Sequence, residues 1–156
     1  MLKSICKLAC LFERGLAKLA PLGDLFIRFW VARVFFKAGL TKIATWQSTV
    51  LLFTYEYKVP LLSPYWAAAI GTGVELVVPA LLLLGLFGRL PAFILFFFNI
   101  ISVVSYPYLL TEDGRIGLND HIYWGILLMV IMLHGPGKLA LDTLIKKLFC
   151  KKSNAC

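Results

Sequence analysis

Four long apolar stretches, at about residues 22–44, 65–87, 90–110 and 116–133, restrict the folds open to this chain. A helix needs about 20 mostly apolar residues to cross the hydrocarbon core of a bilayer. The first three stretches reach that length, and the fourth does so if its first turn lies at the interface. The pattern therefore predicts an all-α, membrane-embedded four-helix bundle.

The composition agrees with this interpretation. Of the 156 residues, 60% are hydrophobic and the mean hydropathy is +0.84, whereas soluble domains are about 45–50% apolar. Turn residues separate the stretches at Ser63-Pro64, Gly88-Arg89 and Gly135-Pro136-Gly137. We expect one transmembrane domain over residues 21–145 and a basic cytoplasmic tail over residues 146–156.

The first 20 residues are basic and only moderately apolar, without the continuous apolar core or cleavage site of a secretory signal. In a helix the basic side chains fall on one face and the apolar ones elsewhere, as in helices that lie in the plane of a membrane surface. We therefore expect residues 1–20 to form a retained amphipathic interfacial helix that precedes the first span.

The net charge of +8 does not form a nucleic-acid-binding patch, because the basic residues flank the apolar blocks. Ten Lys and Arg residues lie in the N-terminus, the turn at residue 89 and the C-terminus, and three lie on the other side: Lys42, Lys58 and Arg115. Positive loops stay in the cytoplasm. The chain is therefore predicted to be a multi-pass protein of a bacterial-type inner membrane with both termini cytoplasmic.

Charged residues inside the apolar stretches are the first candidates for a site. Glu75 lies near the middle of the second stretch, and Arg33 lies at the middle of the first. An intramembrane charge faces the protein interior, a partner or water. Glu75 is expected to pair with a basic residue of the first helix, with Arg28 and Arg33 as the candidates. Such a pair is either a structural ion pair or part of a polar pocket for a redox ligand or proton transfer.

The histidines and cysteines predict no metal site. His121 and His134 are 13 residues apart on one predicted helix and point in different directions, so they cannot share a metal within one chain. Cys6, Cys10, Cys150 and Cys156 are expected on the reducing cytoplasmic side as free or lipidated thiols, and a shared metal site is the disfavoured alternative because the tail pair lacks tight spacing. No phosphate loop, nucleophile elbow or zinc-type spacing is present. The sequence therefore contains no self-contained catalytic constellation.

Two further segments are polar or long enough to note. The connection from Thr45 to Pro64 is expected to be an interfacial or re-entrant element that covers the outer face, and a simple lid is the favoured role. Polar side chains within the third stretch are expected to form hydrogen bonds between helices. These side chains belong to Asn99, Ser102, Ser105 and Tyr106.

Motifs in three of the helices resemble the DoxX family. They are the run from Arg28 to Gly39-Leu-Thr-Lys42, the segments Gly73-Val-Glu75-Leu and Leu84-Gly85-Leu-Phe-Gly-Arg89, and the ending Gly135-Pro-Gly-Lys-Leu-Ala-Leu-Asp142. The resemblance covers about residues 22–145. Two positions depart from the pattern, since Ala140 replaces a usual Ser and Arg33 stands where the family is apolar. Arg28 is the family's charge in the first helix and is thus the better expected partner of Glu75.

The resemblance also implies a function. The segments Tyr55-Glu56-Tyr57 and Asp120-His121-x-x-Trp124 are similar to a subgroup often encoded beside enzymes that modify peptides for copper handling. The wider family includes membrane subunits that pass electrons from sulfur compounds to quinone, and partners of oxidative-stress enzymes.

We therefore expect an inner-membrane accessory subunit of a redox system that binds a quinone or similar hydrophobic carrier and works with a soluble or membrane redox partner. The candidate ligand-binding residues are Arg28, Glu75, His121 and Trp124. The alternative is a non-catalytic membrane partner in copper or modified-peptide homeostasis. The electron donor and the oligomeric state are not encoded in any motif that we identify.

Overall fold

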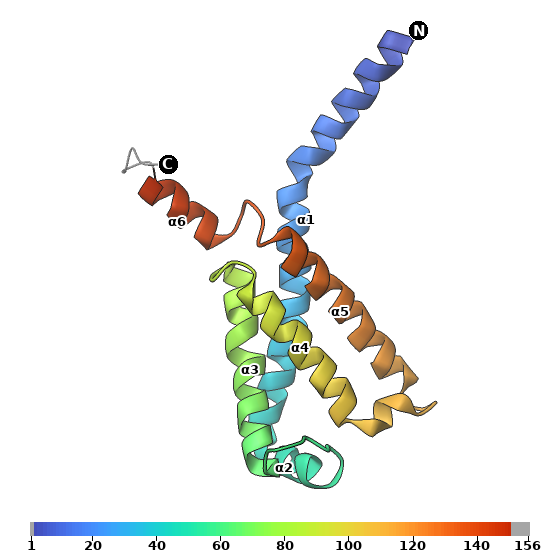
Figure 1. The fold of residues 1–156 in the computed structure, drawn as a ribbon, viewed down its shortest axis with the longest axis vertical. Coiled ribbons are helices and arrows are strands. Elements are labelled where there is room, and N and C mark those ends of the chain that lie inside the picture. The colour runs from blue at the N-terminus through green and yellow to red at the C-terminus, as the bar shows by residue number, and fades with distance from the viewer. Residues whose placement is uncertain (1, 151–156) are drawn as a thin grey trace.

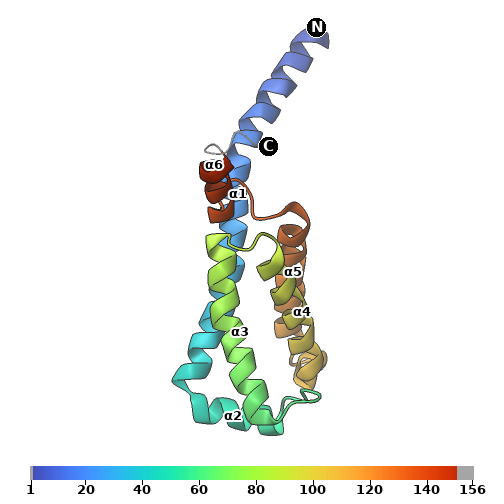
Figure 2. The same cartoon turned by 60° about the vertical axis from the view of Figure 1, so that its left-hand side comes forward.

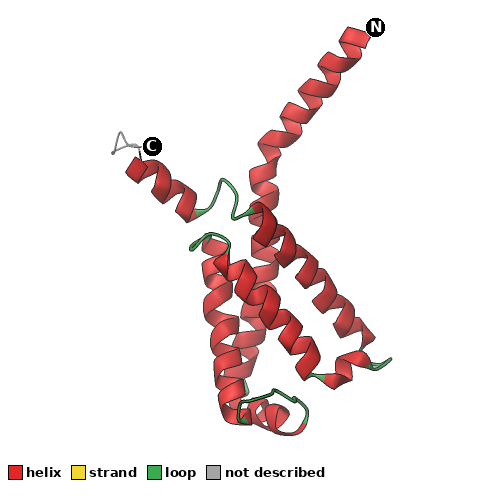
Figure 3. Ribbon diagram, in the orientation of Figure 1, coloured by secondary structure: helices red, strands yellow, loops and turns green. Residues whose placement is uncertain are grey.

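The structure, a computed structural model, describes residues 2–150, and this part of the chain contains helices and no strands (Figures 1 and 3). The elements in chain order are α1 (Leu2–Ala44), α2 (Trp46–Tyr55), α3 (Pro64–Leu84), α4 (Leu90–Ser105), the 3-10 helix η1 (Pro107–Leu110), α5 (Arg115–His134) and α6 (Leu141–Cys150). The all-α prediction is therefore confirmed.

The first helix differs from the prediction because α1 is continuous for 43 residues and contains Pro21. The sequence placed a boundary at this proline, but a proline inside a helix can produce a bend without ending the helix. In Figure 1 the first half of α1 extends away from the other helices, and its side chains from Cys6 to Ala20 are exposed. Whether this half lies on a membrane surface stays a prediction.

The long connection after α1 contains a short helix. Helix α2 starts two residues after α1 ends and runs across the lower end of α3 (Figure 2). Phe53 of α2 packs with Ala67 and Ala68 of α3 in a small separate apolar cluster. We call this end of the molecule, which also holds η1, the α2 end, and the opposite end, with the α3–α4 turn and α6, the α6 end.

Helix α4 is shorter than the predicted third stretch. It ends at Ser105 rather than Leu110 because Pro107 cannot continue the hydrogen-bond ladder. The residue before a proline avoids the helical conformation, and Tyr106 has φ −116° and ψ 85°. The last residues of the stretch form η1, which turns the chain toward α5.

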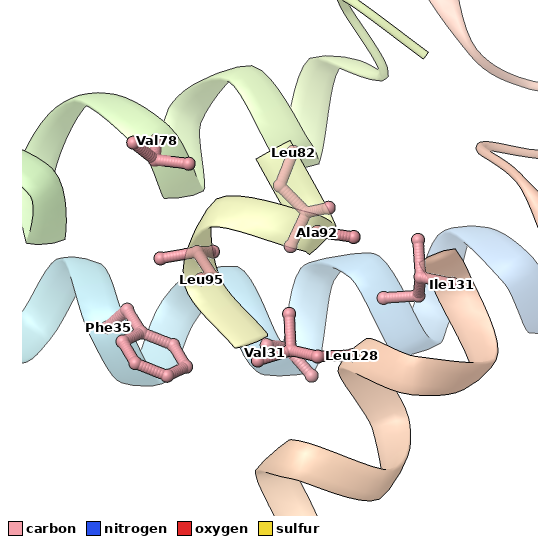
Figure 4. Packing of buried hydrophobic residues seen from close by; sticks show 8 residues of the cluster. All are labelled: Val31, Phe35, Val78, Leu82, Ala92, Leu95, Leu128 and Ile131. Carbon is pink, nitrogen blue, oxygen red and sulfur yellow. The ribbon is translucent and has the colours of Figure 1, made fainter. Parts of the chain in front are cut away.

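One apolar core joins four of the helices. Each of α1, α3, α4 and α5 contributes two buried residues (Figure 4). They are Val31 and Phe35, Val78 and Leu82, Ala92 and Leu95, and Leu128 and Ile131. Many large apolar side chains on the outer faces are exposed. A surface of this kind suits a lipid environment.

Two of the described helices, α3 and α5, are long and apolar enough to cross a membrane. Helix α4 is apolar but has only 16 residues. The second half of α1, after Pro21, carries several charges. The prediction of four crossings therefore goes beyond what length and composition alone support. It stays a prediction, as does the inner-membrane orientation.

Candidate functional site

Glu75 is buried in the middle of α3 and forms an ion pair with Lys42 of α1. Its side chain is 8% exposed, and the Lys42 ammonium donates to both carboxylate oxygens, at 2.7 and 2.6 Å. The attraction between two charges that share two hydrogen bonds and are poorly solvated is much stronger than the attraction within an ion pair at the surface. The expectation that Glu75 meets a basic residue of the first helix is confirmed, but the expected partners Arg28 and Arg33 are wrong.

Helix register explains the partner. A Cβ at Gly39 would lie 2.9 Å from Leu76 and 3.1 Å from the Glu75 Cβ, so α1 and α3 make their close approach at this glycine. Lys42 is three residues further along the same face of α1 and reaches the carboxylate. The sequence counted Lys42 among the charges flanking the spans, whereas it lies inside the packed helices.

Arg28 is more than three turns of α1 away from this pair, at the α6 end. Its side chain is 1% exposed, and Nη2 donates to the Leu139 carbonyl at 3.1 Å. Gly85 ends α3 there in the left-handed conformation with φ 68°, and a Cβ at this position would collide with the Arg28 guanidinium. A cation at a helix C-terminus offsets the partial negative charge of the last carbonyls. Arg28 therefore contacts both the end of α3 and the segment that leads into α6, and its Nε and Nη1 atoms are buried without a hydrogen-bond partner.

The α6 segment closes the same end. The backbone N–H of Gly88 donates to the Asp142 carboxylate, and the N–H of Asp142 donates to the Gly85 carbonyl at 3.3 Å. The motifs that surround Arg28, Gly85 and Asp142 in the sequence thus meet in one place. They fasten the α3–α4 turn to the start of α6.

His121 of α5 is held by Asn99 of α4 through two hydrogen bonds. The Asn99 amide donates to the His121 carbonyl at 2.9 Å, and the Asn99 carbonyl oxygen lies 2.7 Å from His121 Nδ1. Since an amide oxygen only accepts, Nδ1 of this ring carries a proton. In the neutral ring Nε2 is then the free acceptor. The predicted interhelical role of Asn99 is confirmed.

A cavity of about 210 Å³ brings three of the four expected ligand-binding residues together. Glu75, His121 and Trp124 line it, together with Lys42 and Tyr57, and we call it the His121 cavity. The Trp124 ring packs edge-on against His121, with centroids 4.8 Å apart, and against Phe35 at 5.9 Å. Arg28 does not line the cavity.

A second cavity, of about 180 Å³, lies on the α3–α4 side of the ion pair. Lys42, Tyr57, Glu75 and Ser102 line both cavities, so the pair and the tyrosine stand between them. The Ser105 hydroxyl borders this second space, which we call the Ser105 cavity, and is buried without a hydrogen-bond partner. A buried hydroxyl without a partner is costly and marks a place where a ligand could form a hydrogen bond.

Tyr57 follows α2 and reaches into both cavities. Burial, helped by the nearby Tyr106, Glu75 and Glu56, raises the pKa of Tyr57 to about 12. The phenol therefore stays protonated at neutral pH and can donate a hydrogen bond. Its ring stacks between Phe53 and Tyr106, with centroid distances of 4.6 and 4.7 Å.

The remaining polar residues of the third stretch behave in three ways. Ser102 donates to the Phe98 carbonyl within α4, and Tyr106 donates to Glu56. Ser105 has no partner for its hydroxyl, as noted above. The predicted role in joining helices therefore does not hold for the two serines.

Within the described residues no three His, Cys, Asp or Glu side chains are arranged to hold a metal ion. Cys6 and Cys10 are exposed free thiols. The side chain of Cys150, and Cys156 as a whole, lie outside what the structure describes.

Lys42, Tyr57 and Asn99 belong to the site, but the sequence did not single them out as ligand-binding residues. Lys42 stands in the Gly39-x-x-Lys42 motif, and Tyr57 follows an acid and precedes a proline-containing turn. The motif around Lys42 and the turn after Tyr57 indicated that the backbone is constrained at these two positions. Lys42 and Tyr57 line the cavity with Glu75, and Asn99 holds His121. These contacts depend on how the helices and the α2 connection pack together.

Similar sequences identify the family of this chain. Residues 23–107, more than half of the chain, match the DoxX family. An uncharacterized protein of Haemophilus influenzae is 32% identical over 137 residues, which cover 83% of this chain and 87% of that protein. No solved structure matches the chain. On these grounds the chain belongs to the DoxX family of membrane proteins.

Proposed function

We propose that this protein is a membrane accessory subunit of a redox system and binds a quinone or similar hydrophobic carrier in the His121 cavity. One observation carries the proposal. An apolar cleft among α1, α3 and α5 contains a buried ion pair, a protonated phenol and a histidine with a free acceptor nitrogen. Ligand pockets typically combine apolar walls with a few convergent polar groups of this kind.

Donors and acceptors are available for both redox forms of such a carrier. Lys42 uses two of its three N–H groups on Glu75, so the third can donate to a quinone carbonyl, and the Tyr57 hydroxyl can do the same. In the quinol form, the O–H can donate to His121 Nε2. Trp124 supplies a flat wall against which a quinone ring can stack.

The chemistry also requires a partner. A quinone takes up two electrons and two protons to become a quinol, and no side chain in the cavity can supply the electrons. We propose that they come from a soluble or membrane redox partner. His121 and the Lys42–Glu75 pair would hold or pass the protons. The candidate role of Arg28 in binding the carrier is not part of this proposal, since Arg28 lies more than three turns of α1 away from the Lys42–Glu75 pair, at the α6 end.

Titration of the purified full chain with a short-chain ubiquinone tests the proposal, with tryptophan fluorescence as the readout. We expect quenching on binding and about tenfold weaker binding for His121→Phe, the size of effect expected when one good hydrogen bond is lost. His134→Phe is the matched control, because His134 is exposed near the far end of α5.

Equal binding by both variants would show that His121 does not contact the carrier. A wild-type chain that neither binds nor retains a quinone would favour the alternative, a non-catalytic partner in copper or modified-peptide homeostasis. In that case, deletion of the gene should reduce metal tolerance without changing quinone reduction.

A further inference from the structure

Arg33 and Lys37 form a cationic ridge on the outer face of α1. They are one helical turn apart, and both are exposed. The described part of the chain contains two ion pairs, Glu75 with Lys42 and Glu112 with Arg115. Neither cation of the ridge therefore has an acidic partner among the described residues.

The ridge lies alongside a candidate membrane span. Helix α1 runs antiparallel to α3, with Arg28 beside Gly85 and Gly39 against Glu75 and Leu76. Arg33 falls between these two levels and borders Pro79, Ala80 and Leu83 of α3. An uncompensated charge at such a depth is costly. Some group of opposite charge should therefore meet it in the membrane.

Two grooves flank Arg33. One, of about 390 Å³, is lined by Arg33, Lys37, Thr41 and Trp124 with two small apolar residues, and we call it the Lys37 groove. The other, of about 270 Å³, is apolar except for Arg33, and Phe29, Phe36 and Pro79 are among its walls. We call it the Pro79 groove. A charged ridge beside an apolar channel has the form of an amphiphile site.

We propose that this face binds an anionic phospholipid, with its phosphate on Arg33 and Lys37 and one acyl chain in the Pro79 groove. Helical side chains lean toward the N-terminus of their helix, which directs both cations toward the α6 end. Arg33 is about five residues of α1, or roughly 7 Å, from the level of Gly85, within reach of a long side chain that extends to the headgroup region.

A second copy of the chain does not fit this face as well. The exposed acids of the described residues lie at the α2 end or in the N-terminal part of α1, away from the depth of the ridge. They are Glu13, Glu56, Glu112, Asp113 and Asp120. An apolar groove also offers an aliphatic chain a better fit than it offers a polar partner.

Native mass spectrometry of the detergent-purified full chain tests the proposal. The probes are palmitoyl-oleoyl phosphatidylglycerol and the phosphatidylcholine with the same acyl chains. We expect the wild type to prefer phosphatidylglycerol, and Arg33→Gln and Lys37→Gln to weaken its binding by about fivefold each, the effect of one basic residue at an anionic surface. Ala80→Phe, which fills the Pro79 groove, should weaken both lipids alike.

The matched control is the double variant Lys58→Gln/Arg115→Gln, which removes two exposed charges at the α2 end and should keep the wild-type preference. An unchanged thermal midpoint without added lipid confirms that each variant is folded. Equal affinity of the wild type for both lipids, or an unchanged preference in the Arg33→Gln/Lys37→Gln variant, would overturn the proposal. If that variant kept its lipid preference but lost a co-purifying membrane protein, an acidic partner helix would occupy the face instead.

Discussion

At the scale of single residues, the Lys42–Glu75 pair is the most consequential contact in the site. Two charges have been removed from water and satisfy each other through two short hydrogen bonds. Burial of such a pair gives little net stability, but removing one member leaves the other charge uncompensated. The pair therefore constrains which substitutions are tolerated at either position.

We predict that Glu75→Gln and Lys42→Met will each lower the free energy of unfolding by about 3–5 kcal/mol. The double variant should lose less than the sum of the two, because neither charge is then left alone. Chemical denaturation in detergent provides the measurement. Glu112→Gln breaks an exposed pair and should cost less than about 1 kcal/mol.

Additive losses in the double variant would argue against direct coupling of the two side chains. If each single variant keeps its stability but no longer binds the carrier, the pair serves the site and not the fold. If the single variants lose stability but their folded fraction still binds the carrier, the pair has a structural role.

Tyr57 gives the protein a pH dependence on the alkaline side. Its pKa is about 12 in the folded protein and about 10 in an unfolded chain. The folded state therefore holds this proton more tightly than the unfolded state. The resulting contribution to the free energy of unfolding is complete below pH 10 and is lost as the pH rises toward 12. The difference corresponds to a contribution on the order of 3 kcal/mol.

Tyr57→Phe tests this dependence. We expect the unfolding free energy of the wild type to fall relative to that of the variant from about pH 10 to pH 12, and the wild-type phenolate absorbance to titrate late. Tyr55→Phe is the control, because Tyr55 is 79% exposed. A Tyr57 that ionises together with the exposed tyrosines would contradict the buried environment described here.

At the scale of the elements, the closeness of α1 and α3 determines which side chains can meet. Gly39 permits this approach, since the nearest atoms to a Cβ there belong to Leu76 and Glu75. Gly73 lies in α3 just one turn before Leu76, yet a Cβ there would meet nothing within 4 Å. These two glycines thus form a natural comparison.

Gly39→Ala should lower stability by about 1–3 kcal/mol, the usual cost of overpacking. It should also lengthen the Lys42–Glu75 contact and weaken binding of the carrier. Gly73→Ala should instead raise stability by about 0.5–1 kcal/mol, because alanine favours the helix. Thermal unfolding of both variants measures the difference. Equal effects at the two positions would mean that the helices do not meet closely at Gly39.

At the scale of the whole molecule, the chain has two chemically different ends. The start of α1 and helix α6 lie at the same end, and α2 lies at the opposite end (Figure 1). The exposed basic residues of α1's first half, the α3–α4 turn and α6 gather at the α6 end. From the positive-inside rule we predict that this end faces the cytoplasm.

Reporter fusions test this orientation together with the number of crossings. A fluorescent protein that folds only in the cytoplasm should be active at the C-terminus and inactive after Lys58. A phosphatase that is active only outside should give the reverse pattern. Activity of the phosphatase at the C-terminus would contradict the predicted topology, in which both termini are cytoplasmic.

Local features of the sequence determined the helices and the depth of Glu75. Hydropathy and turn residues act over short distances, so α3 and α5 fall within one to three residues of the predicted stretches at each end. The early end of α4 also has a local cause in Pro107, which the apolar run concealed. Likewise, the only acid deep inside a stretch had to find a basic partner, because an isolated charge is too costly there.

Tertiary structure alone decided which partner that is and what surrounds it. The register of α1 against α3 depends on the close approach at Gly39, which brings Lys42 to Glu75 and leaves Arg28 at Gly85. Tyr57 and His121 enter the same site from the α2 connection and from α5, far away in the sequence. Hydropathy records how deep a residue lies, but only packing fixes the rotation and offset of one helix against another.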